Sequence, residues 1–277
     1  MLYLCLAILS STMVSVLMRI GSQGKEARKP MLAVNYLTCM AVSLCIMRGK
    51  FVWRGPGIEA VLGIGIPGGF FYLAAFLLLQ KNVRENGVSL SSAFMKLGVV
   101  VPVLLGITLF GEELGMAKAA GILLTVGAIL VLSGRQEAQQ DRRYLPLVCL
   151  MICGGMADAS SKIYDVFGVP ELEGQFLFTA FSVALLLCIG VCMREHQIPV
   201  WTDWKFGVML GIPNAFSSLF LLWSLASVPA SVAFPVFSCG TILLLTMIGH
   251  LIFRETLEKR QQLSLCLVLA ALVCLNI

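Results

Sequence analysis

The sequence predicts an all-α integral membrane protein with ten transmembrane helices, arranged as two inverted five-helix repeats. Hydrophobic residues make up 58% of the 277 residues and charged residues 13%, whereas soluble domains carry about 25% charged residues. A soluble domain must cover itself with polar side chains, so this apolar excess is expected to face lipid. The count of apolar segments and a set of recurring motifs lead to the same fold class.

Ten segments are long and apolar enough to approach the roughly 20 residues that a spanning helix needs. The uncharged stretch 206–253 is too long for one helix, and Ser227-Val228-Pro229 supplies the turn that divides it. The first segment lacks a basic leader and a cleavage site, so we expect it to be a retained helix. The predicted helices are Met1–Met18, Met31–Met47, Ile58–Leu79, Val88–Phe110, Met116–Ser133, Tyr144–Tyr164, Gly174–Met193, Trp204–Ala226, Ala230–Phe253 and Gln261–Ile277.

The two halves of the chain share motifs at nearly constant spacing. Gly65-Ile66-Pro67-x-x-Phe70 recurs as Gly211-Ile212-Pro213-x-x-Phe216, and Leu109-Phe110-Gly111-Glu112 recurs as Ile252-Phe253-Arg254-Glu255. Because each copy holds five helices, an odd number, the second copy must be inverted relative to the first in the bilayer. The sequence therefore predicts repeats at 1–134 and 144–277, joined by a polar linker at 135–143.

This pattern resembles the drug/metabolite transporter superfamily, specifically its EamA-type ten-helix members. The resemblance covers essentially the whole chain and is carried by Leu109–Glu112, followed by the glycine-flanked run Gly121–Gly127. In the second copy Arg254 stands where the family usually has glycine. The resemblance implies a transporter of amino acids, nucleoside-like metabolites or amphipathic drugs, often an exporter, in the cell membrane.

Two charged residues, Lys96 and Asp158, lie well inside predicted helices. Lys96 interrupts an uncharged segment, where such a cation costs about 2.5–3.5 kcal/mol when central, and Ser92 precedes it by one helical turn. Asp158 stands four residues before Lys162, a spacing that favours an ion pair. We expect Lys96, Ser92 and Asp158 to line a solute site. The alternatives are that Lys96 extends to the membrane interface and that the Asp158–Lys162 pair is structural.

Further candidate solute-binding residues follow from the repeat. Pro67 and Pro213 occupy equivalent positions and each removes a helical hydrogen bond, and paired interruptions of this kind point to a midplane site with gating helices. Asn214 offers an amide, and core or lipid-facing packing is an equally plausible role for the aromatic residues. The remaining candidates are Ser15, Phe70, Tyr72, Phe216, Trp223 and Ser238.

Proton coupling is a candidate property, but the residues leave it open. In the related small multidrug resistance transporters an acidic residue of the first helix carries the proton, whereas this chain has Ser11, Thr12 and Ser15 there. Glu112, Glu113 and Glu255 fall at turns, where they are expected to cap the following helices. His250 is expected to anchor its helix at the membrane interface.

The basic residues give conflicting indications of orientation. Most of the 20 Lys and Arg residues fall in loops after odd-numbered helices, which by the positive-inside rule places both termini outside. The family resemblance instead implies cytoplasmic termini. Because the basic residues are dispersed between apolar segments, the net charge of +5 does not indicate nucleic-acid binding.

These observations favour a secondary transporter that works by alternating access around a central cavity. The sequence has no Walker A motif, no GxSxG or HExxH motif and no CxxC pair, so we expect no ATP hydrolysis, no cofactor, no metal and no enzyme activity. A passive channel or facilitator is the main alternative, and an intramembrane enzyme is a weaker one. The expected partners are a small-molecule solute and the lipid bilayer; a monomer suffices, and a dimer stays open.

Overall fold

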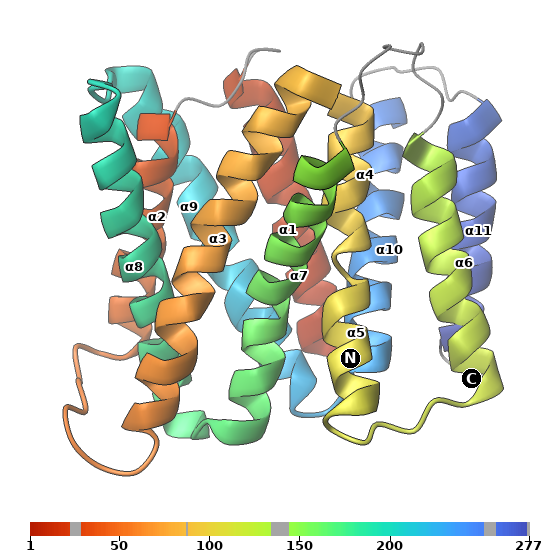
Figure 1. Ribbon diagram of the computed structural model, residues 1–277, viewed down its shortest axis with the longest axis horizontal. Coiled ribbons are helices and arrows are strands. Elements are labelled where there is room, and N and C mark those ends of the chain that lie inside the picture. Colours follow the sequence, from red (N-terminus) through yellow and green to blue (C-terminus); the bar gives the residue numbers. More distant parts are fainter. Residues whose placement is uncertain (23–28, 87, 134–143, 252–258, 276–277) are drawn as a thin grey trace. The chain divides into compact units, whose positions relative to one another are not determined.

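The computed structural model describes residues 1–22, 29–86, 88–133, 144–251 and 259–275, and all regular secondary structure in these ranges is helical (Figure 1). The fold class is therefore all-α, as predicted. The helices are α1 (Leu2–Ser22), α2 (Lys29–Ile46), α3 (Ile58–Asn86), α4 (Val88–Leu97), α5 (Val100–Thr108), α6 (Met116–Ser133), α7 (Tyr144–Phe167), the 3-10 helix η1 (Pro170–Leu172), α8 (Glu173–Arg194), α9 (Trp201–Leu225), α10 (Ala230–Leu251) and α11 (Lys259–Leu275).

Each segment predicted as a helix is helical in its described residues, with one difference. The segment predicted as one helix from Val88 to Phe110 is two helices, α4 and α5, separated at Gly98 and Val99. The predicted turn at Ser227-Val228-Pro229 is confirmed, since α9 ends just before it and α10 begins just after it. The linker 135–143 and the second motif copy at 252–255 lie outside the described residues.

Six of the described helical segments are long and apolar enough to cross a membrane: 29–46, 58–82, 144–167, 170–194, 201–225 and 230–251. Four shorter apolar helical segments accompany them at 2–18, 94–108, 116–131 and 262–275. Large apolar side chains lie on the outside of several helices; Leu123 is 71% exposed and Leu186 is 68% exposed. Exposure of these apolar surfaces to water would cost free energy, whereas in a bilayer they face lipid. The chain is thus an integral membrane protein.

The described helices pack into two compact units that draw on both halves of the sequence. One unit comprises Met1–Leu73 with Ser160–Ala226, and the other comprises Ala74–Ala159 with Ser227–Ile277. Helices α3 and α7 each contribute residues to both units. The packing units therefore do not follow the repeat boundaries predicted at 1–134 and 144–277, which describe sequence duplication and stay a prediction.

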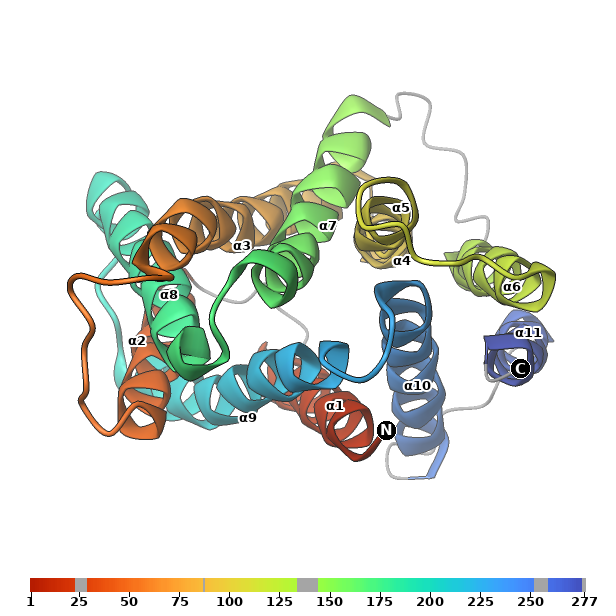
Figure 2. The same ribbon diagram turned by 90° about the horizontal axis from the view of Figure 1, so that it is seen from below.

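In the first unit, α9 packs along both α1 and α2, and α2 also packs on α8 (Figure 2). Small residues allow the close approach of α9 to α2: a methyl group on Gly211 would lie 2.5 Å from Cβ of Thr38 and 2.7 Å from the carbonyl oxygen of Asn35. Close helix contact through small residues is the usual way in which membrane helices associate. Gly211 thus fixes the spacing between α2 and α9.

In the second unit, α6 and α11 form the most extensive helix pair, and α10 packs on α5, α6 and α11. Two buried polar contacts accompany this packing: the Ser264 hydroxyl of α11 donates to the carbonyl oxygen of Ala128 at 2.9 Å, and Thr125 Oγ1 lies 3.3 Å from Cys239 Sγ. Interhelical hydrogen bonds of this kind stabilise helix pairs in lipid, where no water competes. They connect α6 to helices from the other half of the chain.

Candidate functional site

The break between α4 and α5 places irregular backbone inside an apolar segment. Pro102 has no amide hydrogen to donate to Gly98, and the carbonyl oxygen of Gly98 instead accepts from the amide of Val101 at 2.9 Å. Just before the break, the Val99 amide donates to the carbonyl oxygen of Lys96 at 3.2 Å. These three-residue spacings replace the four-residue pattern of an α-helix. A short 3-10 stretch inside a longer helical segment often marks a functional hinge.

Lys96, beside this break, and Asp158 of α7 lie on segments in direct contact, since a methyl group on Gly98 would lie 2.9 Å from the amide nitrogen of Gly155, and their opposite charges are near enough to attract each other. Both side chains are only partly exposed, and both lie in helices that are otherwise apolar around them. An isolated charge would be expensive in such a setting, whereas two opposite charges compensate each other. The pair joins two helices that are distant in the sequence, and it is the main polar feature of the second unit among the predicted site residues.

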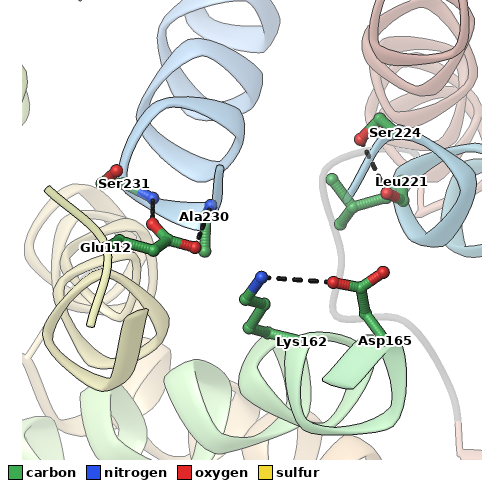
Figure 3. Close-up of polar contacts among 7 residues, drawn as sticks. All are labelled: Glu112, Lys162, Asp165, Leu221, Ser224, Ala230 and Ser231. Carbon is green, nitrogen blue, oxygen red and sulfur yellow. Dashed lines mark hydrogen bonds and ion pairs between the residues drawn. The ribbon is translucent and has the colours of Figure 1, made fainter. Parts of the chain in front are cut away.

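Lys162, expected from helical spacing to pair with Asp158, has a second acidic neighbour on its own helix. Lys162, four residues after Asp158, is buried and forms an ion pair with Asp165 of the same helix, with Lys162 Nζ 3.2 Å from Asp165 Oδ2 (Figure 3). Lys162 thus has a local partner of its own, and Asp158 interacts with Lys96 from another helix. Spacing within α7 accounts for the Lys162–Asp165 pair, whereas the attraction between Lys96 and Asp158 depends on the contact of α7 with the α4–α5 segment.

Glu112 has a structural role, but not the one expected. Its carboxylate accepts hydrogen bonds from the backbone amides of Ala230 and Ser231, both at 2.8 Å (Figure 3). These amides belong to the first turn of α10, where helical hydrogen bonding leaves donors unsatisfied and the helix dipole favours a negative charge. Glu112 therefore caps α10 and not the helix that follows it in the sequence. Glu255 lies outside the described residues.

An aromatic group in the first unit contains two of the predicted site residues. Phe216 stacks on Phe220 with ring centroids 5.6 Å apart, and Phe220 lies 5.8 Å from Trp223. Tyr3 of α1 completes the group, with its ring 5.1 Å from that of Trp223. The indole nitrogen of Trp223 donates to the carboxylate of Glu173 at 2.6 Å, which ties α9 to α8. Sequence reasoning missed Glu173 because nothing in the sequence places α8 beside α9.

The other aromatic candidates, Phe70 and Tyr72, lie on α3 in the same unit. Phe70 is 54% exposed and contacts the ring of its neighbour Phe71 at 5.6 Å. The Tyr72 ring lies 6.0 Å from Phe181, and its backbone carbonyl accepts from the hydroxyl of Tyr36 at 3.4 Å. The Tyr72 contacts therefore join α3 to α2 and α8, whereas the Phe70 contact lies within α3. A contact of either ring with solute stays a prediction.

The polar candidate residues that the structure describes either form hydrogen bonds within the protein or are buried. The amide nitrogen of Asn214 donates to Asn35 Oδ1 at 3.3 Å and lies 3.6 Å from Cys39 Sγ, so this side chain holds α9 against α2. The hydroxyl of Ser15 donates to the carbonyl oxygen of Ser11 on its own helix at 3.1 Å. Ser238 is buried in α10. The side chain of Ser92 lies outside the described residues.

The two repeat-related prolines lie inside continuous helices. Pro67 is within α3 and Pro213 within α9, and both helices run on past them. Their surroundings differ, because Pro67 is exposed whereas Pro213 is buried. The interrupted helix is the one that contains Gly98 and Pro102, two residues that sequence reasoning passed over. Pro102 in an apolar run was the signal that could have identified it.

Comparison with protein families finds a match in the second half of the chain. The EamA-like transporter family matches residues 146–277. These residues form an EamA-like transporter domain. The resemblance seen in the sequence is thus confirmed for an EamA-like transporter family domain over residues 146–277.

Individual relatives agree with this assignment. An uncharacterized protein of Haemophilus influenzae is 28% identical over 295 residues, which cover 98% of this chain and 96% of the relative. A probable 4-amino-4-deoxy-L-arabinose-phosphoundecaprenol flippase subunit ArnE of Sodalis glossinidius is 27% identical over 106 residues, which cover 35% of this chain and 93% of that protein. A protein of known crystal structure has the same fold, with a TM-score of 0.76 at 18% identity, covering 99% of this chain and 94% of the other.

Proposed function

We propose that the EamA-like chain is a secondary transporter that exports small organic solutes, of amino acid, metabolite or drug type, across the cell membrane by alternating access. The observation that carries the proposal is the placement of two opposite charges, Lys96 and Asp158, inside apolar helical segments that touch at Gly98 and Gly155, beside the break between α4 and α5. Charged residues inside membrane helices mark solute and ion pathways, and discontinuous helices build the binding sites of many transporters. The relative named as a flippase subunit supports movement of a solute across the bilayer.

The proposed architecture is ten transmembrane helices in two inverted repeats. The six long apolar segments and four shorter ones in the described ranges are consistent with ten crossings, if the α4–α5 pair makes one of them. The family match covers about the second predicted repeat, which supports a repeat of half the chain length. Inverted repeats commonly place the solute site near the bilayer midplane.

In this site, Lys96 is proposed to bind the negatively charged part of a solute and Asp158 the positively charged part. Their mutual interaction compensates both charges in the empty transporter, and a solute with complementary groups replaces it. Asp158 is also the proposed carrier of a coupled proton. Ser15, Phe70, Tyr72, Phe216, Trp223 and Ser238 stay candidate lining residues, Pro67 and Pro213 stay candidate gating residues, and Ser92 and Asn214 stay candidate polar ligands.

Transport by purified protein in proteoliposomes tests this proposal. A labelled panel of amino acids, nucleosides and cationic drugs is offered with and without an imposed proton gradient, and one class is expected to accumulate. Asp158→Asn is expected to lower transport and flatten its pH profile, and Lys96→Met to weaken solute binding more than it lowers the yield of folded protein. Equilibration without accumulation under a gradient would instead indicate a facilitator or channel, and full activity of both variants would remove the charge pair from the mechanism.

A control variant in the same α4–α5 segment distinguishes the loss of a charge from a general disturbance of packing. Thr108→Val replaces an exposed hydroxyl on α5 that donates to the carbonyl oxygen of Leu104, and it leaves every charge in place. This variant is expected to transport like the wild-type protein. If Thr108→Val is impaired as strongly as Lys96→Met, general disturbance of the α4–α5 segment explains both losses.

A further inference from the structure

The α4–α5 break touches α7 through two glycines. A methyl group on Gly98 would lie 2.9 Å from the amide nitrogen of Gly155 and 2.9 Å from the carbonyl oxygen of Met151. A methyl group on Gly155 would overlap the carbonyl oxygen of Gly98 and lie 2.5 Å from Cγ2 of Val101. The two backbones are therefore as close as helix packing permits, and each position accepts a hydrogen atom but no side chain.

This backbone contact lies next to the charge pair on both helices. Gly98 comes two residues after Lys96, and Gly155 comes three residues before Asp158, which places Gly155 and Asp158 on the same face of α7. The Gly98–Gly155 contact therefore lies close in sequence to both charged residues, on both segments. Its neighbour Gly154 differs, since a methyl group there would lie 3.7 Å from the carbonyl oxygen of Met95, an ordinary contact.

We propose that Gly155 is a positioning residue of the transport site, whose contact with Gly98 sets the separation between Lys96 and Asp158. The proposal rests on the function proposed above, because it assigns that site a geometry that the solute must match. A methyl group at 2.5 Å must move to the 3.5–4.0 Å of ordinary carbon contacts, so Gly155→Ala moves α7 and the α4–α5 break apart by about 1 Å. The same displacement separates the two charged side chains.

Displacements of this size have large effects where groups must meet a ligand in a fixed geometry. For a solute that contacts both charges, Gly155→Ala is expected to raise the KM of transport by on the order of 10- to 100-fold. The maximal rate is expected to change much less, because the charges themselves remain. Gly154→Ala, which adds the same methyl group one residue earlier, is expected to keep the wild-type KM.

A second measurement tests the positioning without any transport assay. The thermal stability of detergent-solubilised protein is measured for Lys96→Met, Asp158→Asn and the double variant, in the wild-type, Gly155→Ala and Gly154→Ala backgrounds. In the wild-type and Gly154→Ala backgrounds the two substitutions are expected to be strongly non-additive, since each alone leaves a charge uncompensated. In the Gly155→Ala background the non-additivity is expected to shrink. Should Gly155→Ala not fold, Gly98→Ala replaces it, because its methyl group makes the milder overlaps.

The possible results separate the two proposals. Non-additivity that is unchanged by Gly155→Ala and Gly98→Ala would overturn the positioning role, whatever the transport data show. Loss of non-additivity together with wild-type transport of every solute would support the positioning role and contradict the use of the pair in transport. A raised KM together with reduced non-additivity is the result expected when both hold.

Discussion

The cap that Glu112 places on α10 gives a quantitative prediction for stability. The two capped amides belong to Ala230 and Ser231, which are both fully buried, so neither can turn to water when the carboxylate is removed. A hydrogen bond to a charged group contributes about 1.5–3 kcal/mol, and loss of a helix cap costs about 0.5–2 kcal/mol. Glu112→Ala is therefore expected to destabilise the folded protein by about 2–4 kcal/mol.

Two variants calibrate this value. Glu112→Gln keeps one acceptor oxygen but directs an amide NH2 group toward the second backbone donor, so its loss is expected to be about half that of Glu112→Ala. Glu113→Ala removes the adjacent, exposed carboxylate and is expected to change stability by less than about 0.5 kcal/mol. Because Glu112 and Glu113 lie in the same loop before α6, the two alanine variants alter the same region of the chain.

The assay is thermal unfolding of the detergent-solubilised protein together with hydrogen exchange along α10. Glu112→Ala is expected to unfold at a lower temperature than Glu113→Ala, and exchange is expected to accelerate at the start of α10 before it does so elsewhere in that helix. Equal unfolding temperatures for the two alanine variants, with unchanged exchange in the first turn of α10, would refute the capping role.

Two further predictions concern helix contacts in the first unit. Gly211→Ala forces a methyl group against α2 and is expected to lower the stability measured by thermal unfolding by about 1–3 kcal/mol. The control Gly63→Ala places its methyl group in open space and is expected to be nearly neutral. Similar losses of stability in the two variants would refute the close α2–α9 contact. Trp223→Phe keeps an aromatic ring but removes the hydrogen bond to Glu173 and is expected to cost about 1–3 kcal/mol, and an equal unfolding temperature for this variant would show that the bond contributes nothing.

Hydropathy predicted the helices because a chain in lipid has few ways to satisfy its backbone. Every polar backbone group in the hydrocarbon must be bonded internally, so a long apolar segment is helical almost wherever it occurs. The segment Met116–Ser133 was predicted with both ends correct. The break at Gly98 was not predicted because the mean hydropathy of a segment does not register a single proline such as Pro102. The helices that continue past Pro67 and Pro213 show that a proline alone does not end a helix.

Contacts between side chains that are far apart in the sequence could not be predicted, and the reason is geometric. Within one helix, spacing predicts neighbours, and it suggested Lys162 as the partner of Asp158. The actual interaction with Lys96 depends on where α4 lies against α7, which no local rule supplies. The same holds for Glu112, whose turn position suggested a cap on the next helix, whereas packing places it on α10.

These long-range contacts have a common pattern, because they join the two halves of the sequence. Helix α1 packs on α9, α2 on α8 and α9, α5 on α10, and α6 on α11. The charge of Lys96 is compensated from the second half, and the first turn of α10 is capped from the first half. Since unpaired charges and uncapped amides are costly in lipid, each half alone would retain groups that only the other half satisfies. The two halves therefore reach their native structure together.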